Sequence, residues 1–259
     1  MPGGERLLDI PEIDGPTSAA LPTGWLGLLV GYPGSDAALL AKQFAEAGTG
    51  TMPVYYYTTY ERTEDVERTF RDFGWDPSSI QVHNLSEEYY QRVLVRDLEV
   101  RRSRERGLSL AELTEAAAAG SSSVRFSLTS RLLTDLGAIN GRFRLVLDSL
   151  DFLLEVLEPA EVMTICRQVR HRAQALGGQA LLAVQGEIHE RRITGLLQDM
   201  ADLVLEVRSE PSGSRHRHVL VVRKVRNHPE RTRTVDLEVT DKGIRATTNP
   251  EGPSLPGGT

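Results

Sequence analysis

The chain has 259 residues, enough for one large α/β domain or for two small domains. Its 36 acidic and 30 basic residues give a net charge of −6, which excludes a surface that is basic throughout and suited to coating nucleic acid. The single cysteine excludes an internal disulfide, and the lack of a signal-peptide pattern or of an apolar run of about 18 residues leads us to expect a cytoplasmic protein without membrane insertion.

Both ends of the chain are rich in proline and glycine. Residues 1–20 contain Pro2, Pro11 and Pro16, and residues 249–259 contain three prolines and three glycines. Such compositions are typical of poorly ordered segments. We therefore expect a flexible N-terminal arm over residues 1–20, a single domain over residues 21–248 and a disordered tail over residues 249–259.

The first strand–loop–helix unit begins with the apolar run Trp25–Val30. A continuous apolar run of this length predicts a strand that is buried on both faces. A loop over residues 31–35 follows, and the helix after it is expected to begin at Asp36 and to stop at Gly48.

The rest of the chain alternates strand and helix patterns, which predicts βαβ units and a mainly parallel sheet. A charged helical excursion is expected at about residues 86–120, where mixed charges are typical of a solvated face. The other expected elements are strands at 53–59, 143–147 and 180–184, helices at 63–73 and 159–176, and three antiparallel edge strands at 203–207, 218–225 and 234–239.

The loop after the first strand has the frame of a phosphate-binding loop, Gly-x-x-x-x-Gly-Lys-Ser/Thr. In that motif the glycines let backbone N–H groups wrap a phosphate, the lysine offsets its charge and the hydroxyl holds magnesium. Here Asp36 stands in place of the second glycine, Ala37 in place of the lysine and Ala38 in place of the hydroxyl. The whole segment reads Gly31, Tyr32, Pro33, Gly34, Ser35, Asp36, Ala37 and Ala38.

These three substitutions predict that nucleotide binds poorly. Losing the lysine and gaining a repulsive carboxylate together lower the affinity by about 10²- to 10⁴-fold. At a helix N-terminus, the Asp36 carboxylate can also accept the free N–H groups that a phosphate would have taken. Our hypothesis is that Asp36 is a built-in substitute for the anion.

The order of several short segments resembles the KaiC-like branch of the RecA/RadA ATPase family. The matching segments are residues 21–24, 31–35, 73–76, 145–149, 224–226 and 240–244. The resemblance covers about residues 10–245. It implies an α/β fold with a RecA-type P-loop NTPase core, often assembled as a hexameric ring with nucleotide held between neighbouring subunits.

The resemblance also assigns roles to residues at the ends of strands. Asp148 matches the acidic residue that ends the Walker B strand, although any βαβ strand can end in aspartate. Glu61 matches one of the paired glutamates that activate water, with Tyr60 in place of the other; it is equally suited to starting a helix. Gln185 matches a polar residue that senses the γ-phosphate.

Lys224 and Arg226 match a Lys-x-Arg pair that reaches the phosphate in the adjacent subunit of KaiC-like rings. Three interpretations stay open for them. They are structural charges, or a basic edge that grips carboxylates of the next subunit, or residues that act on a partner whose own phosphate loop is intact.

DNA binding is a less favoured interpretation. Residues 206–245 are basic, and Arg191 and Arg192 lie where RecA-like folds place a mobile DNA loop, but stacking aromatic residues are missing there and acidic residues flank the arginines. No metal site is expected, because His216 and His218 lack a third ligand nearby in the sequence.

We therefore expect a catalytically inactive KaiC-like protein, a pseudo-ATPase that acts as a regulatory or scaffolding subunit. Its partners are expected to be copies of itself or an active KaiC-like paralogue, and no cofactor is expected beyond weak binding of ATP and magnesium. Two alternatives remain open. One is a weak ATP-binding ATPase, and the other is a RadA-like recombination accessory protein that binds DNA.

Overall fold

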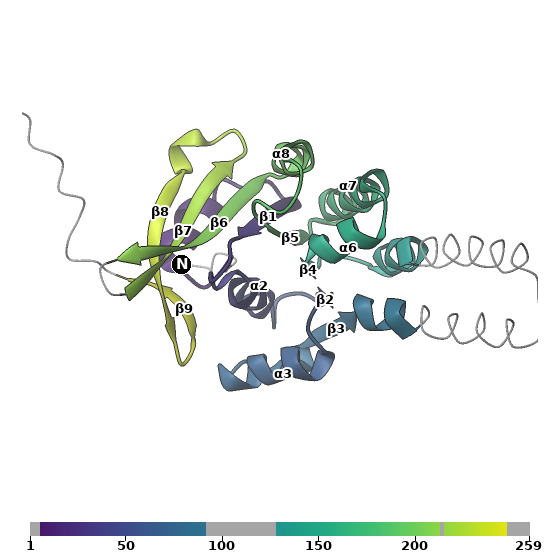
Figure 1. Ribbon diagram of the computed structural model, residues 1–259, viewed down its shortest axis with the longest axis horizontal. Helices are drawn as coiled ribbons and strands as arrows, with labels where there is room; N and C mark the ends of the chain where they lie inside the picture. Colours follow the sequence, from purple (N-terminus) through teal and green to yellow (C-terminus); the bar gives the residue numbers. More distant parts are fainter. Residues whose placement is uncertain (1–5, 92–127, 213–214, 248–259) are drawn as a thin grey trace, which may run out of the picture.

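A nine-stranded sheet in the order β3-β2-β4-β5-β1-β6-β7-β8-β9 runs through the computed structural model, which describes residues 6–91, 128–212 and 215–247 (Figure 1). The pairs among β1 to β6 are parallel, and β6 to β9 pair antiparallel. The strands are β1 (Trp25–Gly31), β2 (Val54–Thr58), β3 (Ile80–Asn84), β4 (Arg144–Asp148), β5 (Gln179–Gln185), β6 (Leu203–Ser212), β7 (Arg215–Val225), β8 (Arg233–Thr240) and β9 (Gly243–Ala246). The expected mainly parallel α/β sheet with antiparallel C-terminal strands is confirmed.

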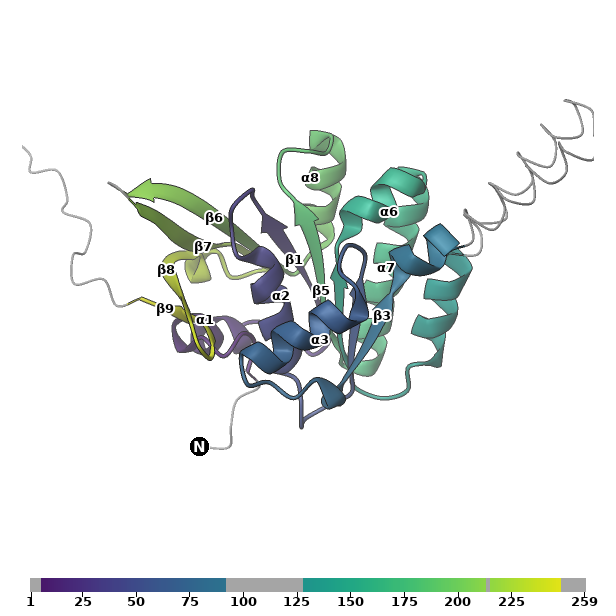
Figure 2. The same ribbon diagram turned by 60° about the horizontal axis from the view of Figure 1, so that its bottom comes forward.

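Helices cover both faces of this sheet (Figures 1 and 2). Side chains of β1 alternate between two apolar cores: Leu28 belongs to the core that includes residues of α6, α7 and α8, and Leu29 belongs to the core that includes residues of α1, α2 and α3. This is why β1 is buried along its whole length and appears in the sequence as an unbroken apolar run. The helices are α1 (Pro11–Ser18), α2 (Ala37–Glu46), α3 (Thr63–Asp72), α6 (Leu150–Val156), α7 (Pro159–Leu176) and α8 (Arg191–Met200), with further helical residues at 85–91 and 128–138 and short 3₁₀ turns at Pro77–Ser79 and Pro229–Arg231.

Residues 6–20 include the helix α1 and several buried side chains, so the expected flexible arm over residues 1–20 is wrong for this stretch. Leu8, Ile10 and Ile13 have no exposed surface and join the core that α2 forms with the sheet. The proline content of this segment suggested disorder, but Pro11 stands in the first turn of α1, where its fixed φ favours a helix. Residues 1–5 lie outside the described residues.

Two other sequence expectations also lie mostly or wholly outside the described residues. These are the tail at 249–259 and the excursion at 86–120, of which only the helical start, residues 86–91, is described. Among the helices of the described residues, none combines the length and the apolar character that crossing a bilayer requires.

Ile13→Ala is expected to lower the free energy of unfolding by about 2–5 kcal/mol, because it leaves a cavity in a packed core. Urea unfolding followed by circular dichroism measures this. Glu12→Ala is the matched control, since its side chain is exposed on the same helix and its loss should change stability by no more than about 0.5 kcal/mol. Equal stabilities of the two variants would contradict the packing of α1.

Candidate functional site

A cleft of about 420 Å³ lies at the carboxyl ends of β1, β2, β4 and β5. Parallel strands end at the same edge of a sheet, so residues that follow different strands meet there. Pro33, Gly34 and Asp36 belong to the same loop but do not line the cleft. The lining includes these residues singled out from the sequence: Gly31, Tyr32, Ser35, Ala37, Ala38, Glu61, Asp148 and Gln185.

The loop between β1 and α2 is closed by its own hydrogen bonds. The Tyr32 N–H donates to Ser35 Oγ at 3.1 Å and to the Val207 carbonyl at 3.2 Å, and the Ser35 N–H donates to the Tyr32 carbonyl at 3.0 Å. Gly34 has a φ of +75°, a left-handed conformation that glycine adopts without strain. Contacts within the protein therefore hold the loop in shape.

The Tyr32 ring packs beside Gly186 and Arg208. A Cβ atom at Gly186 would come within 2.7 Å of the ring, so glycine there allows the ring to pack against the end of β5. The Arg208 guanidinium lies 4.7 Å from the ring centroid, a cation–π distance, and it pairs with Glu206 at 2.8 Å. The Arg208 guanidinium therefore already contacts Tyr32 and Glu206.

Asp36 does not act as the expected substitute for an anion. Its side chain makes no capping hydrogen bond to α2, and its Oδ2 lies 2.8 Å from Nδ1 of His218 on β7. The backbone explains this, because Asp36 has φ −88° and ψ 31° instead of the extended conformation that turns a capping side chain back onto the helix. The first turn of α2 therefore keeps N–H groups that no side chain caps.

Lys42 places a buried positive charge next to the cleft. Its side chain is only 3% exposed, and Nζ lies 2.5 Å from Oε1 of Glu61. We did not single out Lys42 from the sequence, although a signal existed. Lys42 follows Ala38 by four residues, which puts both on one face of α2, and it is the only charged residue between Ala37 and Ala45.

Asp148, at the end of β4, is half-buried and accepts a hydrogen bond. The Tyr56 hydroxyl donates to Oδ2 of Asp148 at 2.6 Å. Burial raises the pKa of the Asp148 carboxyl, while the Lys42 charge and the Tyr56 hydrogen bond oppose this rise. Burial, together with the neighbouring Asp148 charge, also raises the pKa of Tyr56 well above its usual value, so the hydroxyl remains a donor.

Tyr56→Phe is expected to cost about 1.5–3 kcal/mol of stability at pH 7, because the charged Asp148 loses its donor. The sign with pH follows from the raised pKa of Asp148: the folded state binds this proton more tightly than the unfolded state. Stability from this group is therefore greatest at acid pH and falls as pH rises above the unfolded value of 3.8.

In Tyr56→Phe the pKa of Asp148 rises further, so this fall should be steeper than in the wild type. Urea unfolding between pH 4 and pH 7 measures it. Tyr55→Phe, a half-buried neighbour on the same strand, is the control and should differ from wild type by no more than about 0.5 kcal/mol. A Tyr56→Phe cost that does not grow with pH would contradict the assignment.

Asp151 joins three segments around the cleft, and the sequence analysis missed it. Its carboxylate accepts hydrogen bonds from the Gln185 N–H at 3.0 Å and from Ser149 Oγ at 2.6 Å, and it lies 2.6 Å from Nε2 of His189. Gln185 is thereby anchored through its backbone while its side chain lines the cleft. The Ser149-x-Asp151 spacing at the start of α6 was the available signal.

Lys224 and Arg226 lie at the opposite end of the sheet from the cleft of the same chain. Lys224 Nζ donates to the carbonyls of Gln198 and Asp199 at 2.8 and 2.9 Å, at the end of α8. Arg226 donates to carbonyls of the same helix end and pairs with Asp202 at 2.5 Å. Cations at a helix C-terminus are stabilising, which favours the interpretation of both residues as structural charges.

Arg191 and Arg192 form the first turn of α8, so the structure places them on a helix and not in a loop. They are exposed and do not line the cleft. The basic stretch at 206–245 is largely paired within the chain: Arg208 and Arg223 contact Glu206, and Arg217 contacts acidic side chains on β6 and β8. These arginines are held by carboxylates of the same chain, although the stretch keeps its excess of basic residues.

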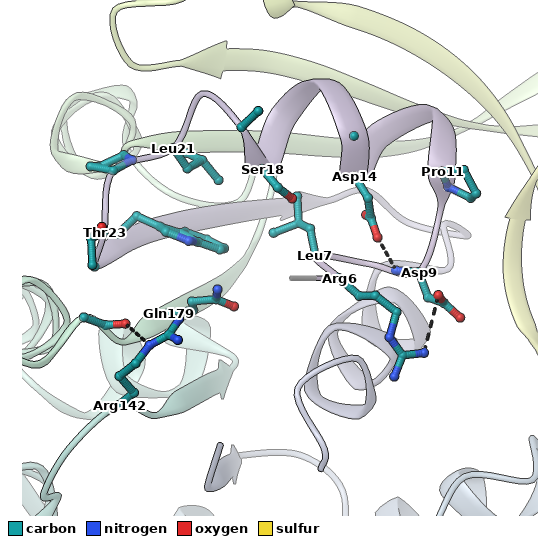
Figure 3. Close-up of a pocket in the computed structure, with 16 residues that line it drawn as sticks. Arg6, Leu7, Asp9, Pro11, Asp14, Ser18, Leu21, Thr23, Arg142 and Gln179 are labelled. Atoms are coloured by element: carbon teal, nitrogen blue, oxygen red, sulfur yellow. Dashed lines mark hydrogen bonds and ion pairs between the residues drawn. The ribbon is translucent and has the colours of Figure 1, made fainter. Parts of the chain in front are cut away.

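A larger cavity of about 790 Å³ opens at the amino ends of the strands, beside α1 (Figure 3). Its charged groups are engaged with their own surroundings. Arg6 pairs with Asp9 at 3.4 Å, Asp14 accepts backbone N–H groups of residues 8 and 9, and Arg142 donates to the Gly177 carbonyl at 3.3 Å. Its two carboxylates, Asp9 and Asp14, are therefore already engaged by Arg6 and by backbone N–H groups.

Three comparisons with known proteins bear on this chain. A family model described as ATPase: KaiC matches residues 8–251. The crystal structure of the KaiC-like protein PH0186 from the hyperthermophilic archaeon Pyrococcus horikoshii OT3 is similar, with a TM-score of 0.59 and 18% identity over 95% of this chain and 98% of that one. None of the curated proteins matches. At 18% identity the structural likeness is evidence of a shared fold alone.

Proposed function

This chain belongs to the KaiC family of ATPases, and from that premise we propose that it is a member that has lost ATP hydrolysis and acts as a regulatory or scaffolding subunit. One observation carries the proposal. Where the family's loop presents an amine and a hydroxyl to the nucleotide, α2 presents the methyl groups of Ala37 and Ala38 to the cleft.

The residues around the cleft do not fit ATP with magnesium. The lining contains the carboxylates of Glu61, Asp148 and Asp151, and within the described residues it includes no lysine or arginine. A triphosphate carries several negative charges, and its binding normally depends on cationic contacts worth about 1.5–3 kcal/mol each. Carboxylates in their place repel it, so we derive no reaction step through a nucleotide.

The candidate base is also poorly placed for catalysis. Glu61 is bound by the Lys42 ammonium at 2.5 Å, so one of its carboxylate oxygens is already engaged within the protein. A general base contributes about 10²- to 10⁴-fold, and only when the attacked phosphate is bound and polarised. The pairing of Glu61 therefore supports an inactive site.

Weak ATP binding is a second candidate, favoured by a specific observation. Because the Asp36 carboxylate lies against His218, the N–H groups in the first turn of α2 remain uncapped. A helix N-terminus with uncapped N–H groups attracts anions. Such a site would bind the phosphates of a nucleotide weakly, without magnesium and without fast turnover.

The partners that we propose are copies of this chain or an active KaiC-like paralogue. Lys224 and Arg226 bind α8 of their own chain, which supports a structural role over an action on a neighbouring phosphate. DNA is the least supported partner, since the arginines at 206–245 mostly pair with acidic side chains of the same chain.

Calorimetric titration with ATP and magnesium tests the proposal, together with a phosphate-release assay. We expect no micromolar binding and no turnover above background. Light scattering with and without ATP tests the scaffolding role, and we expect the same assembly in both. Micromolar binding with turnover, or an assembly that requires ATP, would overturn the proposal, and binding in the millimolar range without turnover would support the second candidate.

A further inference from the structure

The environment of Lys42 is unusual for a lysine. Its side chain is 3% exposed, its ammonium lies 2.5 Å from Glu61, and it sits 5.9 Å from the centroid of the Tyr56 ring, whose hydroxyl binds Asp148. Burying an ammonium costs several kcal/mol unless anionic partners compensate for it. The compensation here comes from carboxylates of the cleft.

The position of Lys42 on α2 explains how it reaches this place. It lies one helical turn beyond Ala38, on the same face of α2. Ala38 occupies the position at which the motif carries a magnesium-binding hydroxyl. The long side chain of Lys42 therefore brings a positive charge to the region that a divalent cation would share with the carboxylates.

The charges of Lys42, Glu61 and Asp148 indicate why this part of the cleft requires a cation. Burial is the main cause of the raised pKa of Asp148, the Glu61 charge adds to it, and the Lys42 charge opposes it. The ammonium thus acts electrostatically on both carboxylates. Without it, the half-buried carboxylates of Glu61 and Asp148, which line the same cleft, would have no lysine beside them, and carboxylate oxygens are the ligands that Mg²⁺ or Mn²⁺ binds.

We infer that the Lys42 ammonium is a permanent internal counter-ion for Glu61 and Asp148, in place of a divalent cation. The inference rests on the proposed loss of function and gives it a physical basis. A site whose negative charge is partly offset by its own lysine needs neither magnesium nor nucleotide to remain folded. The protein would then hold one state at every nucleotide concentration.

Thermal unfolding of Lys42→Ala with MnCl₂, with MgCl₂ and with EDTA tests this, with no nucleotide present. In EDTA the variant is expected to melt about 5 °C below wild type, because the half-buried carboxylates of Glu61 and Asp148 lose a neighbouring cation. Millimolar Mn²⁺ is expected to recover about 3 °C or more in the variant, and less than about 1 °C in wild type.

Two further variants make the test decisive. Lys42→Ala/Glu61→Gln should lose the response to Mn²⁺, because one of the two carboxylates is gone. Lys42→Gln is milder and keeps the test readable if Lys42→Ala fails to fold. A wild-type response to Mn²⁺, or no response in either single variant of Lys42, would overturn the inference. ATP turnover by the wild type would overturn the proposed function instead, so the two failures are distinguishable.

Discussion

Asp36→Gly, Ala37→Lys and Ala38→Thr together are expected to raise the affinity for ATP with magnesium by about 10²- to 10⁴-fold. The expectation has a structural reason. The loop already has its glycine in the left-handed conformation, its internal hydrogen bonds and an uncapped helix behind it. The amine and the hydroxyl are the missing parts, and calorimetry on wild type and variant measures the difference.

Single variants separate the contributions of the three positions. Ala37→Lys should account for most of the gain, and Ala37→Met, which has similar length but no charge, should give none. Asp36→Gly alone should change the affinity by less than about 10-fold, because its carboxylate is directed to His218 and not to the helix N–H groups. No gain in the triple variant would contradict our view that this loop is a phosphate cradle without its charges.

Asp202→Ala is expected to lower the free energy of unfolding by about 3–5 kcal/mol. Asp202 is 1% exposed, and its carboxylate accepts the Leu26 N–H at 3.1 Å and pairs with Arg226 at 2.5 Å and with Arg170 at 3.4 Å. Removing it leaves a buried N–H and two guanidinium groups without this acceptor. Urea unfolding followed by circular dichroism measures the loss.

Asp202→Asn is the matched control. The amide oxygen still accepts the Leu26 N–H, so the cost should be smaller and should reflect mainly the lost charge. Arg226→Ala should also destabilise the protein, since it removes the cation that binds the end of α8. If Asp202→Ala cost less than about 1 kcal/mol, the structural interpretation of Arg226 would be wrong.

Periodicity and glycine positions were sufficient to predict most of the fold. The continuous apolar runs became β1, β4 and β5 in the centre of the sheet, and the alternating runs at the C-terminus became antiparallel strands. The short strands β3 and β9 and the helices α6 and α8 were not predicted, and the N-terminal segment was predicted wrongly. Its prolines suggested disorder, but burial of Leu8 and Ile13 against α2 and the sheet outweighs composition.

The candidate site was predictable where it depends on strand ends. The loop at 31–38, Glu61, Asp148 and Gln185 meet because the carboxyl ends of parallel strands share one edge. Lys42 and Asp151 were missed, since their roles depend on partners that lie 19 and 34 or more residues away in the chain. The expected capping by Asp36 failed for a related reason, because the side chain of Asp36 contacts His218, which is 182 residues away in the chain.

Short stretches of the sequence therefore specify the order of most strands and helices and the frame of the loop at residues 31–38. They also show that this loop lacks the lysine and the hydroxyl residue of the phosphate-binding motif. Local hydrogen bonding and apolar periodicity act over a few residues, so they can be recognised without a structure. The partners that charged side chains contact cannot be recognised from short stretches in this way. Burial makes an unpaired charge costly, so Asp36, Lys42 and Arg226 turn to whichever partners the folded chain brings near, and only the packed arrangement of the sheet and helices identifies those partners.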